Sequence, residues 1–206
     1  IYEGYGRVKS AYPYRQRNTY TRELKEMEIH TAVLENRYLK AVFLPEFGGR
    51  LWELWDKYTG RNLLYTNDVL QFSNLAVRNA WFSGGVEWNI GIIGHNPFTT
   101  EPLYTAQTVN EDGEPVLRMY EYERIRKVTY QMDFWLEKDS SFLNCRMRIV
   151  NEGKEVVPMY WWSNMAVPEY KNGRVVVPAV QAFTSRGTQV TKVDLPMVEN
   201  IDISDY

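Results

Sequence analysis

The sequence predicts an all-β fold built from antiparallel strands, and three observations support this prediction. Aromatic residues, which favour strands together with β-branched ones, are abundant, with 15 Tyr, 8 Phe and 7 Trp in 206 residues. Short runs of alternating apolar and polar side chains follow one another, separated by turns rich in Gly, Asn and Asp. Helical periodicity is scarce, and this pattern is typical of a sandwich or a large antiparallel sheet assembly.

Composition narrows the classes of function. The net charge is -2, with acidic and basic residues mixed along the chain, so no basic stripe is present for nucleic acid. No apolar run approaches the roughly 20 residues of a membrane helix, and we expect neither nucleic acid nor a membrane as a partner. Cys145 is the one cysteine, which favours a reducing, cytoplasmic compartment. On a strand its side chain would point to the same face as those of Leu143 and Met147, which predicts a buried, inert thiol.

The first part of the chain predicts an irregular segment followed by strands. Residues 1–24 show no clear pattern and are expected to wrap over the sheets or to come from a preceding segment, leaving residues 25–206 as one domain. Alternation predicts strands at residues 23–36, 38–44, 50–55 and 62–65. Gly48-Gly49 supplies the turn between the second and third of these strands, and residues 56–60 close a hairpin after the third.

From Leu103 onward the sequence predicts an antiparallel meander. The expected strands are residues 103–109, 116–124, 127–137, 142–150, 155–167 and 174–178. Asp112-Gly113 is a strong hairpin signal between the first two. Residues 201–206 still alternate as if entering another strand or loop, so we expect a piece of a longer protein.

The segment from Trp81 to Phe98 is the most informative candidate site. Its four glycines and many hydrogen-bonding side chains make a poor helix and a poor continuous strand, which predicts a shaped, ligand-facing loop. Glu87 and His95 are close enough for one loop to present both, as general acid and base catalysis requires. The alternative, in which both residues only stabilise a packed connection, stays open.

A second candidate group follows on the predicted strand at residues 155–167. Trp161 and Trp162 are adjacent, so their indoles must point to opposite faces of that strand. One indole can fill the core while the other stacks on a sugar ring, with Asn164 and Glu169 bonding the hydroxyl groups. We expect the glycine-rich segment and the two indoles to border one sugar-sized hollow. Burial of both indoles between two sheets is the alternative.

Other site chemistries lack their motifs. His30 and His95 lie far apart without a cysteine pair, so the sequence predicts no zinc site, and no calcium loop is readable. No nucleophile elbow or phosphate-binding glycine motif is present. We therefore expect neither a metal nor a cofactor.

Residues 36–51, with Pro45 followed by Gly48-Gly49-Arg50, resemble the opening of galactose mutarotase-like (aldose 1-epimerase-like) domains. From about residue 25 the chain resembles an uncharacterised branch of this superfamily that often occurs beside tetratricopeptide repeats in bacterial proteins. Residues 84–89 with His95, and residues 161–164, resemble the most specific sequence motifs of that branch. The resemblance implies an antiparallel β-supersandwich that is incomplete at its C-terminus, and tetratricopeptide repeats in the same full-length chain.

The resemblance also implies a function, the binding of a sugar ring in a cleft across one sheet. A carboxylate would remove the anomeric hydroxyl proton while a histidine, for which His95 is the candidate, protonates the ring oxygen. In the family that carboxylate lies on a late strand, which we expect to be absent from this piece. Ser83 replaces an arginine that often precedes the glycine pair, and Asn164 stands where mutarotases carry a catalytic histidine. The residues expected to bind the sugar are Arg50, Trp88, Asn89, Asn96, Trp161, Trp162, Asn164 and Glu169.

Three functions remain open from the sequence. The first is a carbohydrate-binding domain without chemistry of its own, which the asparagine at position 164 favours. The second is an active sugar epimerase, mutarotase or glycoside-processing enzyme that uses His95 and a carboxylate, with Glu87 and Glu169 as the pair for hydrolysis. The third is a structural domain of a larger repeat protein, because a fold does not determine a function.

Overall fold

The structure is a computed structural model, and it describes residues 12–18, 21–73, 78, 80–90, 94–157 and 160–205. Every regular element in these residues is a β-strand, and all strand pairs are antiparallel, which confirms the predicted all-β antiparallel class. Within the same residues, no helix has the length and apolar character needed to cross a membrane. The chain divides into two compact units, residues 1–167 and 168–206.

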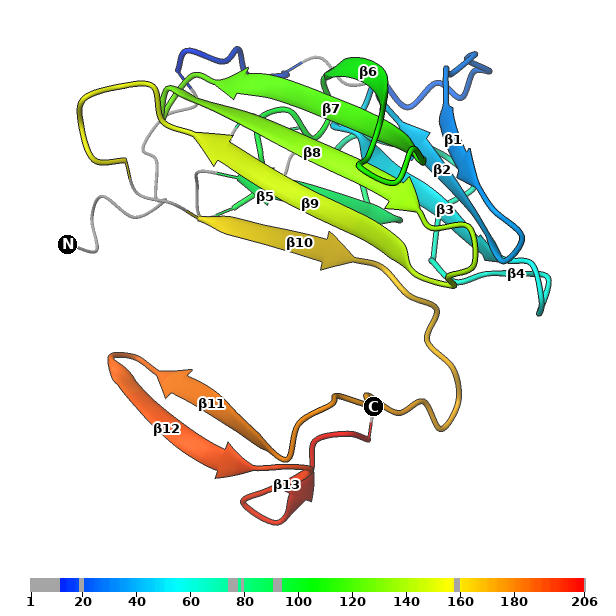
Figure 1. Ribbon diagram of the computed structural model, residues 1–206. Helices are drawn as coiled ribbons and strands as arrows, with labels where there is room; N and C mark the ends of the chain where they lie inside the picture. Colours follow the sequence, from blue (N-terminus) through cyan, green and yellow to red (C-terminus); the bar gives the residue numbers. More distant parts are fainter. Residues whose placement is uncertain are drawn as a thin grey trace. The chain divides into compact units, whose positions relative to one another are not determined.

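The first unit holds two antiparallel sheets (Figure 1). The larger has the strand order β1-β2-β3-β5-β10, with β4 paired to β3. Its strands are β1 (Ala32–Glu35), β2 (Leu39–Leu44), β3 (Arg50–Asp56), β4 (Arg61–Asn62), β5 (Val86–Ile90) and β10 (Trp161–Met165). The smaller sheet is a meander of β6 (Tyr104–Val109), β7 (Pro115–Glu123), β8 (Val128–Leu136) and β9 (Leu143–Val150).

The two sheets of the first unit pack against each other and enclose the apolar core. Phe43 of β2 and Trp88 of β5 both contact Phe134 of β8, with ring centroids 4.8 and 5.1 Å apart. Met132 is buried on the same side of β8, while Tyr120 of β7 is exposed on the outer face. Burying each large apolar side chain in this way contributes roughly 1.5–3 kcal/mol to the stability of the fold. The alternation of apolar and polar residues therefore favours packing of the two sheets into a sandwich.

The loop predicted for residues 81–98 is corrected by the structure, because it contains strand β5. Val86 and Glu87 are both buried, so the strand is covered on both faces and shows no apolar-polar alternation. Gly85 precedes the strand at a φ of 65°. A Cβ at this position would collide with the carbonyl oxygen of Leu51 in β3, so glycine allows β5 to begin beside β3.

The strand predicted at residues 23–36 is wrong for most of its length. Residues 21–31 have no regular secondary structure, and only β1 pairs, with β2. Met27 is exposed, and alternation alone does not supply the backbone hydrogen bonds that a strand needs from a neighbour. His30, expected within a strand, lies in this irregular stretch with its Nδ1 3.2 Å from Oε1 of Glu46.

Other predicted strands are shorter or missing. The strand predicted at residues 62–65 is reduced to β4, and the one at residues 155–167 is reduced to β10. Residues 158–159 lie outside the described residues, and residues 174–178 form no strand. Side-chain alternation does not reveal how far a neighbouring strand extends, and that neighbour determines the length of the pairing.

Cys145 is exposed, which contradicts the buried thiol predicted from its parity. The parity itself is right, because Cys145 pairs with Phe134 and its neighbours Leu143 and Met147 pack against the core. However, β9 is the last strand in the order of its sheet. A side chain on an edge strand has a neighbouring strand on one side only, so an inward direction does not guarantee burial.

Residues 12–18 are the first described part of the segment that was predicted to be irregular. Residues 12–18 form no strand, and Tyr14 is buried against the sandwich. Its hydroxyl donates a hydrogen bond of 3.0 Å to Oε1 of Glu123. Residues 1–11 and 19–20, to which the same prediction applies, lie outside the described residues.

The second unit contains two short antiparallel pairs. One pairs β11 (Gln181–Arg186) with β12 (Gln189–Asp194), and the other pairs β13 (Met197–Val198) with β14 (Ile201–Asp202). Gly187 occupies the first turn at a φ of 64°. Many large apolar side chains of this unit are exposed, among them Val176, Val180 and Phe183. No strand was predicted for the residues of the β11–β12 hairpin.

Candidate functional site

Strands β5 and β10 bring parts of the two predicted groups together. Side chains alternate along a strand, and directly paired residues of neighbouring strands share a face. Val86 of β5 belongs to the core, so Glu87 and Asn89 point to the other side of the sheet. Trp162 pairs with Asn89, and Asn164 pairs with Glu87. These four side chains, Glu87, Asn89, Trp162 and Asn164, share the side of the sheet that we name the Glu87 face.

Glu87 is the centre of the hydrogen bonds on this face. Glu87 is only 2% exposed, and its side chain accepts hydrogen bonds from Nδ1 of His95 (2.9 Å) and Nε1 of Trp81 (3.0 Å). Nη2 of Arg50 lies 3.8 Å from Oε1. Burial alone would raise the pKa of Glu87, but the bond from His95 and the charge of Arg50 outweigh it, so the pKa is lowered. Glu87 is therefore ionised at neutral pH.

The bond to Glu87 determines which ring nitrogen of His95 carries the proton. An ionised carboxylate only accepts hydrogen bonds, so Nδ1 is the donor and Nε2 of the neutral ring remains an acceptor. The His95 side chain is 24% exposed, and its ring lies 5.2 Å from the ring of Trp81 and 5.6 Å from that of Trp162. The site thus presents a partly exposed imidazole that a buried carboxylate orients.

Arg50 joins the start of β3 to the segments on either side of β5. Its Nη1 donates to the carbonyl oxygens of Phe82 and Gly84, and its Nη2 donates to Oγ1 of Thr99 at 2.7 Å. The guanidinium carbon also lies 3.7 Å from the centroid of the Phe82 ring. Burial lowers the pKa of Arg50 to about 10, against the opposing effect of Glu87. Arg50 is still a cation at neutral pH and balances the Glu87 charge.

Two buried N–H groups on the Glu87 face have no hydrogen-bond partner among the described residues. They are Nδ2 of Asn89 and Nε1 of Trp162, on paired residues of β5 and β10. Asn89 is 0% exposed, and its Oδ1 accepts a 2.6 Å bond from the backbone N–H of Asn96. Leaving such a donor without an acceptor costs roughly 1–3 kcal/mol, so these groups suit a water or a ligand oxygen.

The remaining predicted site residues are Trp88, Trp161, Asn96 and Glu169. Trp88 and Trp161 pack against the core with their rings 6.2 Å apart and 5° from parallel. Nε1 of Trp88 donates to the carbonyl oxygen of Gly49 at 3.0 Å. Asn96 is buried, and its Oδ1 accepts the N–H of a residue two positions later. Glu169 is exposed and belongs to the second unit.

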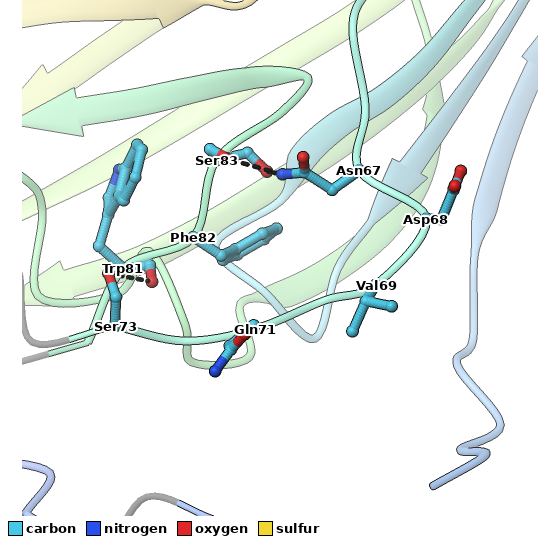
Figure 2. A pocket seen from close by; sticks show the side chains of 8 residues that line it. All are labelled: Asn67, Asp68, Val69, Gln71, Ser73, Trp81, Phe82 and Ser83. Carbon is cyan, nitrogen blue, oxygen red and sulfur yellow. Dashed lines mark hydrogen bonds between the residues drawn. The ribbon is translucent and has the colours of Figure 1, made fainter. Parts of the chain in front are cut away.

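A cavity of about 480 Å³ is lined in part by Trp81, one of the two residues that donate a hydrogen bond to Glu87 (Figure 2). Its lining residues are Asn67, Asp68, Val69, Gln71, Ser73, Trp81, Phe82 and Ser83. Pockets for small molecules measure roughly 300–1,000 Å³, so the size suits a compact ligand. The single hollow predicted between the glycine-rich segment and both indoles is not formed in that way. Trp161 faces the core, and Trp81, rather than the indoles of β10, borders the cavity.

Two parts of this site were not predicted from the sequence. Trp81 stood at the start of the predicted loop, yet nothing in the sequence indicated that its indole N–H donates to Glu87. The segment at residues 67–73 carries no motif, and nothing in its sequence predicted that it lines a cavity. Within the described residues, no group of three or more His, Cys, Asp and Glu side chains could hold a metal ion.

Comparison with known proteins adds a family and a fold. Residues 6–206 match the family described as Domain of unknown function (DUF5107). A solved structure of similar fold is a TPR-domain containing protein from Parabacteroides distasonis, with a TM-score of 0.74 and 23% sequence identity. The match covers 93% of this chain and 32% of that protein, so the chain spans about a third of its length. At this identity the likeness concerns the fold alone.

Proposed function

The chain belongs to the DUF5107 family. We propose that it is a carbohydrate-binding domain whose ligand contacts the Glu87 face. The observation that carries the proposal is the position of His95, oriented by Glu87 beside the ring of Trp162. The proposal includes the galactose mutarotase-like supersandwich for residues 25–206, after an N-terminal wrap at residues 1–24. It also includes tetratricopeptide repeats elsewhere in the full-length chain.

The chemistry of the Glu87 face suits a neutral sugar. A sugar ring offers an apolar face to an aromatic side chain, and its hydroxyl groups both donate and accept hydrogen bonds. Trp162 and His95 supply the rings, and the exposed amide of Asn164 supplies a donor and an acceptor. The unpartnered N–H groups of Asn89 and Trp162 need an oxygen acceptor, which a hydroxyl group or a bridging water provides.

The charge balance of the site disfavours a phosphorylated sugar. The guanidinium group of Arg50 is buried, its Nη1 and Nη2 donate to Phe82, Gly84 and Thr99, and Glu87 balances its charge. No free cation is therefore supplied by the Glu87 face. The serine at position 83, where related sugar-phosphate enzymes often carry an arginine, agrees with a neutral ligand.

The Glu87–His95 pair favours a second candidate function, that of an epimerase or mutarotase. With Nδ1 bonded to the carboxylate, Nε2 of His95 can exchange a proton with a sugar oxygen. The oxygens of Glu87 are already engaged by His95, Trp81 and Arg50, so in this proposal Glu87 is a positioning residue. The other members of the Glu87 face are Asn and Trp, so a second carboxylate is not supplied there. Binding without chemistry is therefore the first proposal.

An NMR titration with galactose, glucose and N-acetylglucosamine tests the binding proposal. Because His95 contacts the sugar and Glu87 orients it, His95→Ala and Glu87→Gln should each weaken binding at least tenfold without unfolding the protein. The exposed pair of His30 and Glu46 provides matched controls, and His30→Ala and Glu46→Gln should leave binding unchanged. Binding that survives both changes at 87 and 95 would exclude the Glu87 face as the site.

The same samples separate the two candidate functions. An enzyme must exchange the anomers faster than they interconvert spontaneously, and His95→Ala must abolish that acceleration. Chemical shift changes without acceleration support a binding domain. If none of the sugars binds, the carbohydrate proposal fails and a structural domain of a larger protein remains.

A further inference from the structure

We propose that the cavity lined by Asn67, Gln71 and Trp81 is a second sugar subsite, so that the ligand of this domain is an oligosaccharide of at least two rings. The inference rests on the proposed function, because the first ring is the one that contacts the Glu87 face. The cavity lining includes neither His95 nor Trp162, so it is a separate place for a second ring.

Trp81 connects the two subsites. Its Nε1 donates to Glu87 at 3.0 Å, its ring lies 5.2 Å from the ring of His95, and the same residue lines the cavity. A ligand in the cavity and a ligand at His95 would therefore share one aromatic side chain as a common wall. The two rings of a disaccharide are adjacent, and each can contact the face or the edge of an indole.

The lining of the cavity matches a neutral, hydroxyl-rich ligand. The lining combines amide, carboxylate and hydroxyl side chains with an apolar wall that includes the buried ring of Phe82. Asp68 makes no ion pair within the described part of the chain, and no lining residue is cationic. A carboxylate with free lone pairs accepts hydrogen bonds from hydroxyl groups and repels a phosphate or a uronate.

The walls of the cavity are tied together before any ligand arrives. Nδ2 of Asn67 donates to Oγ and to the carbonyl oxygen of Ser83, and the backbone N–H of Ser73 donates to the carbonyl oxygen of Trp81 at 2.8 Å. Figure 2 shows a hydrogen bond between Asn67 and Ser83 and another between the Ser73 hydroxyl and Trp81, which join residues 67–73 to residues 81–83. A preformed site loses less conformational entropy on binding than one that must first be ordered.

Calorimetric titration of matched sugars tests the second subsite. The pairs are galactose with lactose, glucose with maltose, glucose with cellobiose, and N-acetylglucosamine with its β-1,4-linked dimer. For at least one pair, the disaccharide should bind at least tenfold more tightly than the monosaccharide. Gln71→Ala and Asp68→Asn should each remove most of this gain and leave the affinity for the monosaccharide unchanged.

Both substituted residues are exposed, so the variants should keep the melting temperature of the native protein. Gln107→Ala and Asp112→Asn, at exposed positions on or beside the meander sheet, are matched controls and should retain the disaccharide gain. Equal affinity for both members of every pair, or a gain that survives both cavity variants, overturns the second subsite while the proposed function stands. Absence of binding by all the sugars overturns both.

Discussion

Glu87 and Glu123 are both fully buried glutamates, with exposures of 2% and 0%, yet they are held by different kinds of partner. Glu123 ends β7 and accepts bonds from the backbone N–H groups of Ile125 and Arg126 in the turn that follows. The hydroxyl of Tyr14 supplies a further donor at 3.0 Å. Glu123 therefore stabilises a turn and an N-terminal segment.

Glu87 is bonded mainly to side chains, and one of them reaches the surface. Its donors are His95, which is partly exposed, and Trp81, which lines a cavity, while Arg50 balances its charge. The comparison teaches that burial of a carboxylate does not by itself mark a site. A buried charge that orients a partly exposed titratable group is the arrangement typical of function.

Replacing Arg50 should have the largest effect on the Glu87 side of this comparison. Arg50→Met leaves a buried carboxylate without its cation, and breaking a buried ion pair costs roughly 3–5 kcal/mol in the free energy of unfolding. Urea denaturation provides the measurement. Arg37→Met is the control, because its pair with Asp139 is exposed and should contribute less than about 1 kcal/mol. Equal losses in the two variants would mean that Arg50 is not needed to bury Glu87.

The turn into β5 should show the next largest effect. Gly85→Ala combines a positive φ with a collision against the Leu51 carbonyl, so we expect a loss of about 2–3 kcal/mol and a displaced Glu87. Gly60 has the same φ of 65° with nothing within 4 Å of an added Cβ. Gly60→Ala should therefore cost about 1 kcal/mol, from strain alone. Comparable melting temperatures for both variants would exclude the collision as the cause.

Changing each glutamate to glutamine should separate their roles. Glu123→Gln and Glu87→Gln each disturb a buried hydrogen-bond acceptor, and each should lower the free energy of unfolding by about 1–3 kcal/mol. Only Glu87→Gln should weaken sugar binding, because Glu123 bonds to a turn. Denaturation and NMR titration of the same two samples give both quantities. A loss of binding in Glu123→Gln as large as that in Glu87→Gln would remove the distinction.

The pH dependence of stability should show the smallest effect. The pKa of Glu87 in the folded protein lies below its ordinary value of 4.5, so its ionised form contributes stability above about pH 4.5. That contribution is lost as the pH falls through the folded-state pKa. The free energy of unfolding, measured from pH 6 to pH 3, should fall less steeply for Glu87→Gln than for the native protein. Parallel curves would contradict the lowered pKa.

The meander β6–β9 was the part of the fold that the sequence predicted best. Its strands are neighbours in the sequence, so each pairing depends on a local turn, such as the one at Asp112-Gly113, and on local alternation. The predicted bounds differ from the observed ones by one residue at most ends. Strand β5 was missed because its partner β10 lies far along the chain and because both faces of β5 are covered.

The candidate site was predictable in part. Glu87 and His95 were paired because one segment holds both, and their hydrogen bond agrees with that expectation. The opposite directions of Trp161 and Trp162 also followed from strand geometry. The contribution of Trp81 was not predictable, since the bond from its indole to Glu87 depends on how the residues between them fold.

Amino-acid order alone determined the strand-forming character of this protein, the hairpin turns of the meander and the parity of its side chains, because these depend on residues within one turn or strand. Only the tertiary structure decided that Trp162 lies beside His95 while Trp161 joins the core, and that residues 67–73 and Trp81 enclose a cavity. The physical reason is that the face of a strand becomes core or surface according to which distant sheet packs on it, and local alternation carries no information about that partner.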